Sequence, residues 1–166
     1  PNSGKSALLV ALTGAAATVA PYPQSTREPA FGPLEDEDGQ LFTLADLPGL
    51  AADGTPRSDA RLGQLERAAL VIICVPVADP ETFRGELECV RRGIAPFAPS
   101  TARELVVATH AEPGCDRPAG ADMLVDSLGG AGIPQLRRGV IEILREARDE
   151  RRRAEGGDPP QEPAGR

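Results

Sequence analysis

The chain has 166 residues, enough for one ordinary domain with a single hydrophobic core. Its net charge of −7 argues against nonspecific adhesion to nucleic acid or anionic membranes, although the charge of a whole chain does not exclude a local basic patch. The three cysteines have no metal-binding or disulfide spacing, and no apolar run reaches the roughly 18 residues of a membrane span, so we expect reduced thiols and a cytoplasmic protein.

The first nine residues read PNSGKSALL, in which Gly4, Lys5 and Ser6 run directly into an apolar helical pattern. In a phosphate-binding loop, glycine-rich backbone points N–H groups at phosphate oxygens, the lysine reaches the terminal phosphates and the hydroxyl holds Mg²⁺. The helix that follows, predicted from Gly4 to about Ala11, adds the positive end of its dipole. The motif's opening glycine and the strand before it would precede Pro1, so we expect a fragment that lacks its first strand. Gly-Lys-Ser alone also fits a helix start without a ligand, so the assignment depends on partner motifs.

Residues 20–33 contain four prolines and are predicted to form a loop, because proline cannot continue a helix. An Asp-Gly pair in the acidic segment Glu35–Gly39 predicts a hairpin that pairs Phe31–Leu34 with Gln40–Ala45. We interpret the carboxylates of this segment as a solvated turn rather than as a metal site.

The most hydrophobic run is Leu70–Val77, which is β-branched and nearly continuous. Such a run is typical of a strand that is covered on both faces, and we predict it to be central in a parallel sheet. Asp79 and Pro80 then begin a helix that is predicted to reach about Arg92, with Gly93 as its stop.

Two shorter strands and a long helix follow. The strands are predicted at Glu104–Thr109 and Asp122–Asp126, and the helix from Ile133 to about Arg151. Arg151–Arg153 is interpreted as the solvated end of this helix rather than as a nucleic-acid patch. Strands that alternate with helices predict an α/β domain over residues 1–153, with a mostly parallel central sheet flanked by helices. Residues 154–166 are rich in proline, glycine and charge, and are predicted to be a disordered tail or linker.

A partner for the phosphate loop lies in Leu41–Leu50, an apolar strand that delivers Asp46 and then Gly49. An aspartate at a strand end can hold Mg²⁺ through its water shell, and a glycine N–H can approach a γ-phosphate because no side chain blocks it. The sequence Asp-Leu-Pro-Gly could also be merely a turn. Its occurrence together with Gly-Lys-Ser favours a nucleotide site, so we expect Lys5 and Asp46 to meet around one triphosphate–magnesium complex.

These motifs resemble those of the G domain of the Obg family, translation-factor-class GTPases with the P-loop NTPase architecture. The likeness runs from Pro1 to about Leu144. Pro1–Ser6 is similar to the family's Pro-Asn-x-Gly-Lys-Ser loop, and Ala45–Leu50 matches its switch II. Tyr22–Thr26, followed by Pro29 and Gly32, resembles its switch I signature Tyr-Pro-Phe-Thr-Thr.

The resemblance implies a set of site residues. The phosphates would be bound at Asn2, Ser3, Gly4, Lys5, Ser6, Ala7 and Gly49, the base at Thr109, His110, Glu112, Ser127 and Leu128, and Mg²⁺ at Ser6, Thr26 and Asp46. Thr26 would order switch I only while a γ-phosphate is bound. Asn2 resembles a loop asparagine that is associated with K⁺ in several relatives, where a monovalent cation takes the place of an arginine finger. An ordinary surface asparagine is the alternative.

Two positions depart from the family's pattern. Leu50 stands where Ras-like proteins place the glutamine that orients the attacking water, so we expect slow turnover and assign no general base. The base-recognition segment Asn/Thr-Lys-x-Asp is replaced by Thr109-His110-Ala111-Glu112. Glutamate keeps the charge, but its extra methylene moves the carboxylate by more than a hydrogen bond tolerates unless the loop shifts. Guanine and adenine both stay open, because one branch of the family also has glutamate there and prefers ATP. His110 either stacks on the base or is an ordinary loop residue.

The leading hypothesis is therefore a GTP-binding switch that hydrolyses GTP slowly with Mg²⁺. The resemblance implies that its partner is the large subunit of the ribosome or another large assembly. An ATPase of the same fold, and a degenerate nucleotide-binding or interaction module without turnover, are the alternatives. A metabolic P-loop kinase is disfavoured, because the Asp-x-Pro-Gly element belongs to switch proteins and no arginine-rich lid is apparent.

Overall fold

The computed structural model describes residues 3–14, 30–47, 49–50, 54–55, 62–126 and 129–156. The predictions for Asn2, for the loop that includes Thr26, for Ser127 and Leu128, and for most of the tail lie outside these residues. In chain order the elements are α1 (Lys5–Thr13), β1 (Ala30–Glu35), β2 (Leu41–Asp46), the 3-10 helix η1 (Gly63–Arg67), β3 (Leu70–Pro76), α3 (Pro80–Ile94), β4 (Arg103–Thr109), β5 (Met123–Leu124) and α4 (Ile133–Ala154).

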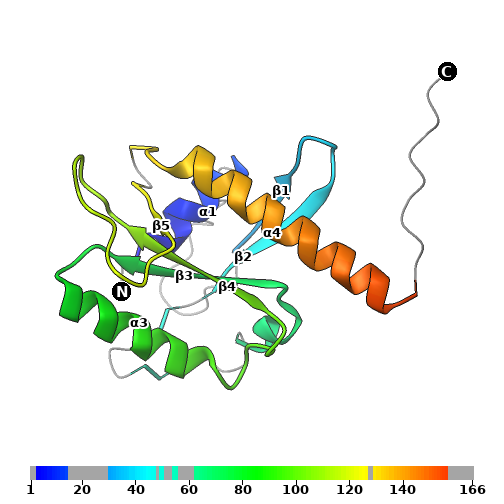
Figure 1. Cartoon of the computed structure of the whole chain (residues 1–166), viewed down its shortest axis with the longest axis horizontal. Helices are drawn as coiled ribbons and strands as arrows, with labels where there is room; N and C mark the ends of the chain where they lie inside the picture. The colour runs from blue at the N-terminus through cyan, green and yellow to red at the C-terminus, as the bar shows by residue number, and fades with distance from the viewer. Residues whose placement is uncertain are drawn as a thin grey trace, which may run out of the picture.

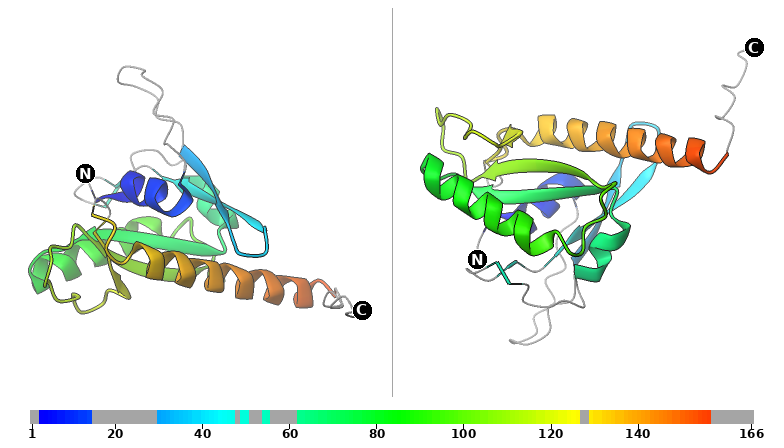
Figure 2. Two further views of the ribbon diagram at one scale, coloured as in Figure 1. Left: turned by 90° about the horizontal axis from the view of Figure 1, so that it is seen from above. Right: turned by 60° about the horizontal axis from the view of Figure 1, so that its bottom comes forward.

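The described strands form two sheets. β1 and β2 pair antiparallel, whereas β3, β4 and β5 pair parallel in that order. Helices α1 and α4 lie on one face of the parallel sheet and α3 lies on the other (Figure 1, Figure 2). A parallel sheet flanked by helices confirms the α/β fold class that the sequence predicts.

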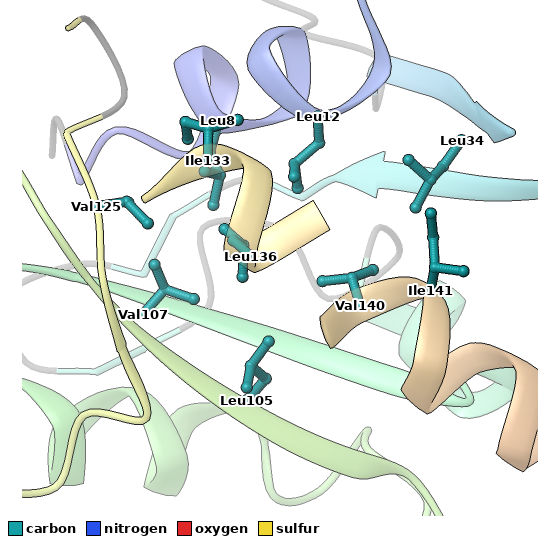
Figure 3. Packing of buried hydrophobic residues seen from close by; sticks show 10 residues of the cluster. All are labelled: Leu8, Leu12, Leu34, Leu105, Val107, Val125, Ile133, Leu136, Val140 and Ile141. Carbon is teal, nitrogen blue, oxygen red and sulfur yellow. The ribbon is translucent and has the colours of Figure 1, made fainter. Parts of the chain in front are cut away.

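Two hydrophobic cores cover the two faces of β4. Because successive side chains of a strand point to opposite faces, Leu105 and Val107 face one core while Val106 and Ala108 face the other. The larger core, between the sheet, α1 and α4, contains Leu8, Leu12, Leu34, Val125, Ile133, Leu136, Val140 and Ile141 as well (Figure 3). The smaller core holds the two buried side chains of α3, Phe83 and Leu87. The helices are thus fixed to the sheet that positions the strand ends.

β3 is the edge strand of the parallel sheet in the part of the chain that the structure describes, and β4 is the middle strand. The prediction that Leu70–Val77 is central is therefore wrong for the described residues. Both faces of β3 are covered, as the continuous apolar run predicts, since Ile72 and Ile73 contact the cores on opposite sides. An apolar pattern reports on the two faces of a strand and carries no information about its two edges.

The β1–β2 hairpin is confirmed, with Ala30 paired to Asp46 and Glu35 paired to Leu41. The loop predicted for residues 20–33 is wrong over residues 30–33, which belong to β1. Pro33 is compatible with this strand because β1 pairs on one side only among the described residues, and a residue without an N–H group is tolerated at a sheet edge.

The acidic turn of the hairpin is partly buried, which corrects its interpretation as a solvated turn. Asp36 is 6% exposed, and its Oδ1 accepts hydrogen bonds from the N–H groups of Asp38 and Gln40 at 2.9 and 2.8 Å. Its Oδ2 accepts a hydrogen bond at 2.8 Å from Nε of Arg145 on α4, and Arg145 also pairs with Asp38. The bond from Arg145 holds the pKa of the Asp36 carboxyl below its usual range, although burial opposes this shift. The hairpin turn is thereby fixed to a helix that lies far along the chain (Figure 1).

Helix α3 is longer than predicted, because Gly93 lies inside it and Ile94 is its last residue. The glycine at position 93 is explained by close packing and not by the end of the helix. A Cβ at this position would lie 2.5 Å from Cδ1 of Leu50 and would also meet the carbonyl oxygen of Gly54. Asp79 begins the helix as predicted, since its carboxylate accepts hydrogen bonds from two backbone N–H groups at 3.1 Å.

The remaining boundaries differ by a few residues from the predictions. Helix α1 ends at Thr13, where Gly14 takes a left-handed conformation, and α4 ends at Ala154. Of the strand predicted at Asp122–Asp126, only Met123–Leu124 pairs. None of the helices that the structure describes is long and apolar enough to cross a membrane.

Candidate nucleotide site

The start of helix α1 has the conformation of an anion site. Gly4, which caps the helix, has a φ of +75°, in the left-handed region that glycine adopts without strain. No side chain caps this end, and the first turn contains no acidic residue. The N–H groups of the first turn, which includes Ala7, and the positive end of the helix dipole can therefore act together on phosphate oxygens.

Lys5 and Gly49 lie side by side at this helix end. Nζ of Lys5 donates a hydrogen bond to Oγ of Ser3 at 3.2 Å, and it lies 3.5 Å from the place that a Cβ would take on Gly49. The loop after β2 and the phosphate loop therefore meet at one point. Because residue 49 has no side chain, its backbone can approach whatever group the lysine binds.

Ser6 connects α1 to the end of β2. Its Oγ donates a hydrogen bond to Oδ2 of Asp46, across 40 positions of the chain. The other carboxylate oxygen of Asp46, Oδ1, is buried and has no hydrogen-bond partner among the described residues. A buried oxygen without a partner is costly unless something binds it, and a carboxylate beside a hydroxyl suits Mg²⁺, which prefers oxygen ligands.

The number of oxygen ligands at this point also fits Mg²⁺. Ser6 and Asp46 together supply a hydroxyl and a carboxylate. Mg²⁺ commonly uses one or two protein ligands and completes its shell with substrate phosphates and water. The Ser6–Asp46 pair therefore fits a metal that arrives together with a nucleotide.

The end of β4 is tied directly to the phosphate loop. Thr109 is fully buried, and its Oγ1 donates a hydrogen bond to the carbonyl oxygen of Ser3 at 2.9 Å. His110 follows with a φ of +58°, and it is the one residue other than glycine with a positive φ among those described. Its Nε2 lies 3.1 Å from the place that a Cβ would take on Gly4. The imidazole therefore packs over the left-handed glycine, which fixes the predicted base segment against the predicted phosphate segment.

A hollow of about 370 Å³ lies beside His110. It is lined by Val77, His110, Glu112, Pro113, Gly114 and Cys115. The N–H of Ala111 donates to the carbonyl oxygen of Val125 at 3.2 Å, which holds this segment beside the strand that precedes Ser127 and Leu128. Glu112 is exposed and lines the hollow, and its carboxylate is of the type that accepts hydrogen bonds from a base edge.

Two features near the site could not be predicted from the sequence motifs. Leu50 packs over Gly93, so its apolar side chain rests on helix α3. Cys74 packs against the larger core, and burial raises the pKa of its thiol to about 12; the charge of Lys5 lowers this pKa by a smaller amount, and the charge of Asp46 raises it further. The thiol is therefore neutral near pH 7 and acts as an apolar group beside the site. Because successive side chains of a strand point to opposite faces, the position of Cys74 in β3 could have indicated that its side chain faces the same core as Ile72.

The structure thus brings two groups of predicted residues together. One contains Ser3, Gly4, Lys5, Ser6, Ala7, Asp46 and Gly49, and the other contains Thr109, His110 and Glu112. Thr109 and His110 join the two groups. The roles assigned to these residues stay predictions, and those of Asn2, Thr26, Ser127 and Leu128 concern residues outside the described part of the chain.

Comparison with known proteins agrees with this geometry. Residues 1–108 match the protein family described as 50S ribosome-binding GTPase. The chain is 33% identical over 161 residues to GTPase Obg of Rhizorhabdus wittichii, covering 87% of this chain and 46% of that protein. It is 36% identical over 102 residues to GTPase Obg of Bacteroides fragilis, covering 60% of this chain and 26% of the relative. The chain therefore spans half or less of the length of these relatives.

A solved structure with a similar fold is the G domain of the FeoB iron transporter of T. maritima. The match has a TM-score of 0.61 and 25% sequence identity, and it covers 87% of this chain and 93% of that domain.

Proposed function

This chain belongs to the family of 50S ribosome-binding GTPases, and from that premise we propose that it is a GTP-binding switch that hydrolyses GTP slowly with Mg²⁺. The observation that supports the proposal most is the hydrogen bond from Ser6 to Asp46. It joins a strand-end carboxylate to the hydroxyl of the residue that follows Lys5 in the phosphate loop, and NTPases of this class hold Mg²⁺ through such a pair.

Each group at the site would then have a distinct task. The first-turn N–H groups of α1 and the ammonium of Lys5 would hold the phosphates, and the Gly49 backbone would approach the γ-phosphate. Bound Mg²⁺ would neutralise charge that develops on the phosphates, with Ser6 and Asp46 holding it from the protein side. Thr26 would add a further ligand in the GTP state.

Slow turnover is proposed because Leu50 has no group that can orient water and packs on α3 instead. Without such a group, faster hydrolysis requires a catalytic contribution from a bound ion or from a partner. We propose that K⁺ bound near Asn2 supplies it, in place of an arginine finger. Phosphate release in K⁺ compared with Na⁺, for the unmodified protein and for Asn2→Ala, tests this step. A rate that is the same in both salts contradicts it.

Guanine is the base that the carboxylate of Glu112 suits better. An ionised carboxylate only accepts hydrogen bonds, and guanine offers N–H donors at N1 and N2, whereas N1 of adenine is an acceptor. The longer glutamate side chain favours the second candidate function, an ATPase of the same fold, if it cannot take that position. A module that binds without turnover is the third.

The large ribosomal subunit is the proposed partner. The matching family is described as ribosome-binding, and the curated relatives are named GTPase Obg. The place of action would then be the cytoplasm.

Equilibrium binding of fluorescent GDP and ADP separates the three functions. Tight GDP binding supports the GTPase, tight ADP binding supports the ATPase, and weak binding of both supports the module without turnover. Ser6→Ala tests the metal geometry, because GTP affinity should fall at least tenfold with Mg²⁺ present and change little in EDTA. Ser100→Ala is the control, since Ser100 is an exposed serine away from the site. Equal effects of Ser6→Ala with and without Mg²⁺ would contradict the assignment of the metal site.

A further inference from the structure

The β1–β2 hairpin has one face that is covered and one that is open. Leu34 is fully buried, and Phe42 and Leu44 pack against the larger core between α1 and α4. The opposite side of the hairpin, called the outer face, consists of exposed residues from both strands. Cross-strand pairing places Phe31 opposite Ala45, Pro33 opposite Thr43, and Glu35 opposite Leu41 on this face.

The outer face is unusually apolar for a solvated surface. Phe31 is 54% exposed and Leu41 is 69% exposed, and these are the two exposed large hydrophobic residues of the described chain. An antiparallel sheet with one open side normally alternates apolar and polar residues, so that the open side is polar. Here Pro33 lies between the two large side chains and Ala45 lies opposite Phe31, so that apolar residues extend along the face for about 13 Å, the rise of four strand residues, with Thr43 and Glu35 as its polar members. Contiguous apolar surface of this kind marks interaction sites.

Charge limits the kind of partner that fits. The segment 30–46 contains Glu35, Asp36, Glu37, Asp38 and Asp46 and no basic residue. Arg145 pairs with Asp36 and Asp38, but Glu35 and Glu37 have no ion pair within the described residues. A surface that binds RNA needs lysine or arginine to neutralise phosphates, and this face has none. An apolar strip beside free carboxylates is complementary to a protein surface with apolar and basic side chains.

The hairpin is also held rigidly. At its turn end, Asp36 is bonded to Arg145 and Arg137 donates to the carbonyl oxygen of Glu35, and both bonds lie away from the nucleotide site. Its turn lies against α4, at the end of the molecule away from β5 (Figure 1, Figure 2). A preformed surface loses little conformational entropy on binding.

We propose that the outer face of the hairpin is a docking surface for a protein component of the large ribosomal subunit, one that presents an apolar side chain beside lysine or arginine. The inference rests on the proposed function for the identity of the assembly. It adds that this contact is made to protein and not to ribosomal RNA. Because Ala45 precedes the site residue Asp46, the docking surface is continuous with the nucleotide site.

Sedimentation with purified large ribosomal subunits, in the presence of a non-hydrolysable GTP analogue, tests the proposal. The variant with Phe31→Ser and Leu41→Ser should bind at least tenfold more weakly. Thr43→Lys should also weaken binding, because it adds a positive charge opposite a basic partner. Thr101→Lys is the matched control, since Thr101 is an exposed threonine before β4, and it should bind as the unmodified protein does. Tighter binding by Thr43→Lys would indicate RNA and overturn the proposal.

A photo-crosslinker at position 41 gives a second readout. Crosslinks to a ribosomal protein support the proposal, and crosslinks to ribosomal RNA overturn it. Affinity for fluorescent GDP in each variant verifies that the fold is intact. If the unmodified protein binds subunits and the serine and lysine variants bind equally well, only this inference fails. If the unmodified protein binds GTP but no subunits, the ribosomal part of the proposed function fails together with the inference.

Discussion

Two glycines of helix α3 should respond oppositely to the same substitution. Gly85 is exposed, and a Cβ there would have no neighbour within 4 Å. Gly93 lies under the segment that follows Asp46, where a Cβ would meet Leu50 and the carbonyl oxygen of Gly54. Both lie within α3, Gly85 in its interior and Gly93 one residue before its end, so alanine offers each a gain in helix propensity. The difference in sign between the variants therefore reports the contact at Gly93.

The expected magnitudes follow from these distances. Gly85→Ala should raise the free energy of unfolding by about 0.5–1 kcal/mol, the usual gain of alanine over glycine in a helix. For Gly93→Ala, overpacking costs about 1–3 kcal/mol, because a methyl group 2.5 Å from Leu50 cannot fit without movement. Subtracting the helix gain from the middle of this range leaves a net loss of about 1 kcal/mol.

Urea unfolding of the two variants and the unmodified protein provides the assay. Leu50→Ala in the Gly93→Ala background should restore part of the loss, because it removes one of the two contacts while the carbonyl of Gly54 remains. Equal stabilisation by Gly85→Ala and Gly93→Ala would refute the reasoning, since it would mean that residues 50 and 54 do not rest on α3.

Three further predictions concern the site and the hairpin. Thr109→Val should lower the free energy of unfolding by about 1–2 kcal/mol by leaving the Ser3 carbonyl without its donor, whereas Thr109→Ser keeps the bond and should cost less; urea midpoints distinguish them. The lowered pKa of Asp36 means that its contribution to stability is present above the unfolded-state pKa of about 3.9 and is lost as the pH falls through the folded-state pKa. Urea midpoints of Asp36→Asn should therefore fall less between pH 6 and pH 3 than those of the unmodified protein, and an equally steep fall would show that Arg145 does not hold this carboxylate. With the other two cysteines replaced by serine, Cys74 should react with a thiol reagent at pH 8 only after unfolding, and reaction in the folded state would contradict its raised pKa.

The phosphate site could be predicted because the residues that would bind phosphate are close together in the sequence. Gly4, Lys5 and Ser6 are consecutive, and the left-handed φ of Gly4 and the helix start follow from them alone. That Asp46 would reach Ser6 required only that β2 end beside α1, and a family resemblance supplies that arrangement. His110 is different, because its positive φ and its packing over Gly4 depend on how β4 meets the phosphate loop.

The errors in the fold concern contacts between distant segments. The residues next to Gly93 in the sequence suggest that it ends a helix. The need for glycine there is explained only by the contact with residues 50 and 54, which are distant in the chain. The burial of Asp36 likewise requires Arg145, which lies on another element. That β3 is paired along one edge only in the described part of the chain could not be predicted from its residues, since its two faces are covered whether or not both edges are paired.

The hairpin is bonded to the rest of the domain at both ends, by Ser6–Asp46 and by Asp36–Arg145. These two bonds determine which residues can move when a ligand binds at the nucleotide site. A ligand that takes Oγ of Ser6 from Asp46 removes the anchor at one end. The bond to Arg145 at the other end is costly to break, because it would leave the buried carboxylate of Asp36 without its ion pair. Paired strands do not stretch, so we expect the displacement to pass into the residues after Asp46, which include Leu50 and Gly54 on α3. Hydrogen exchange with and without GTP should therefore change at residues 49–55 and stay constant at the hairpin turn. Exchange that changes at the turn and not at residues 49–55 would place the flexible point in the hairpin instead.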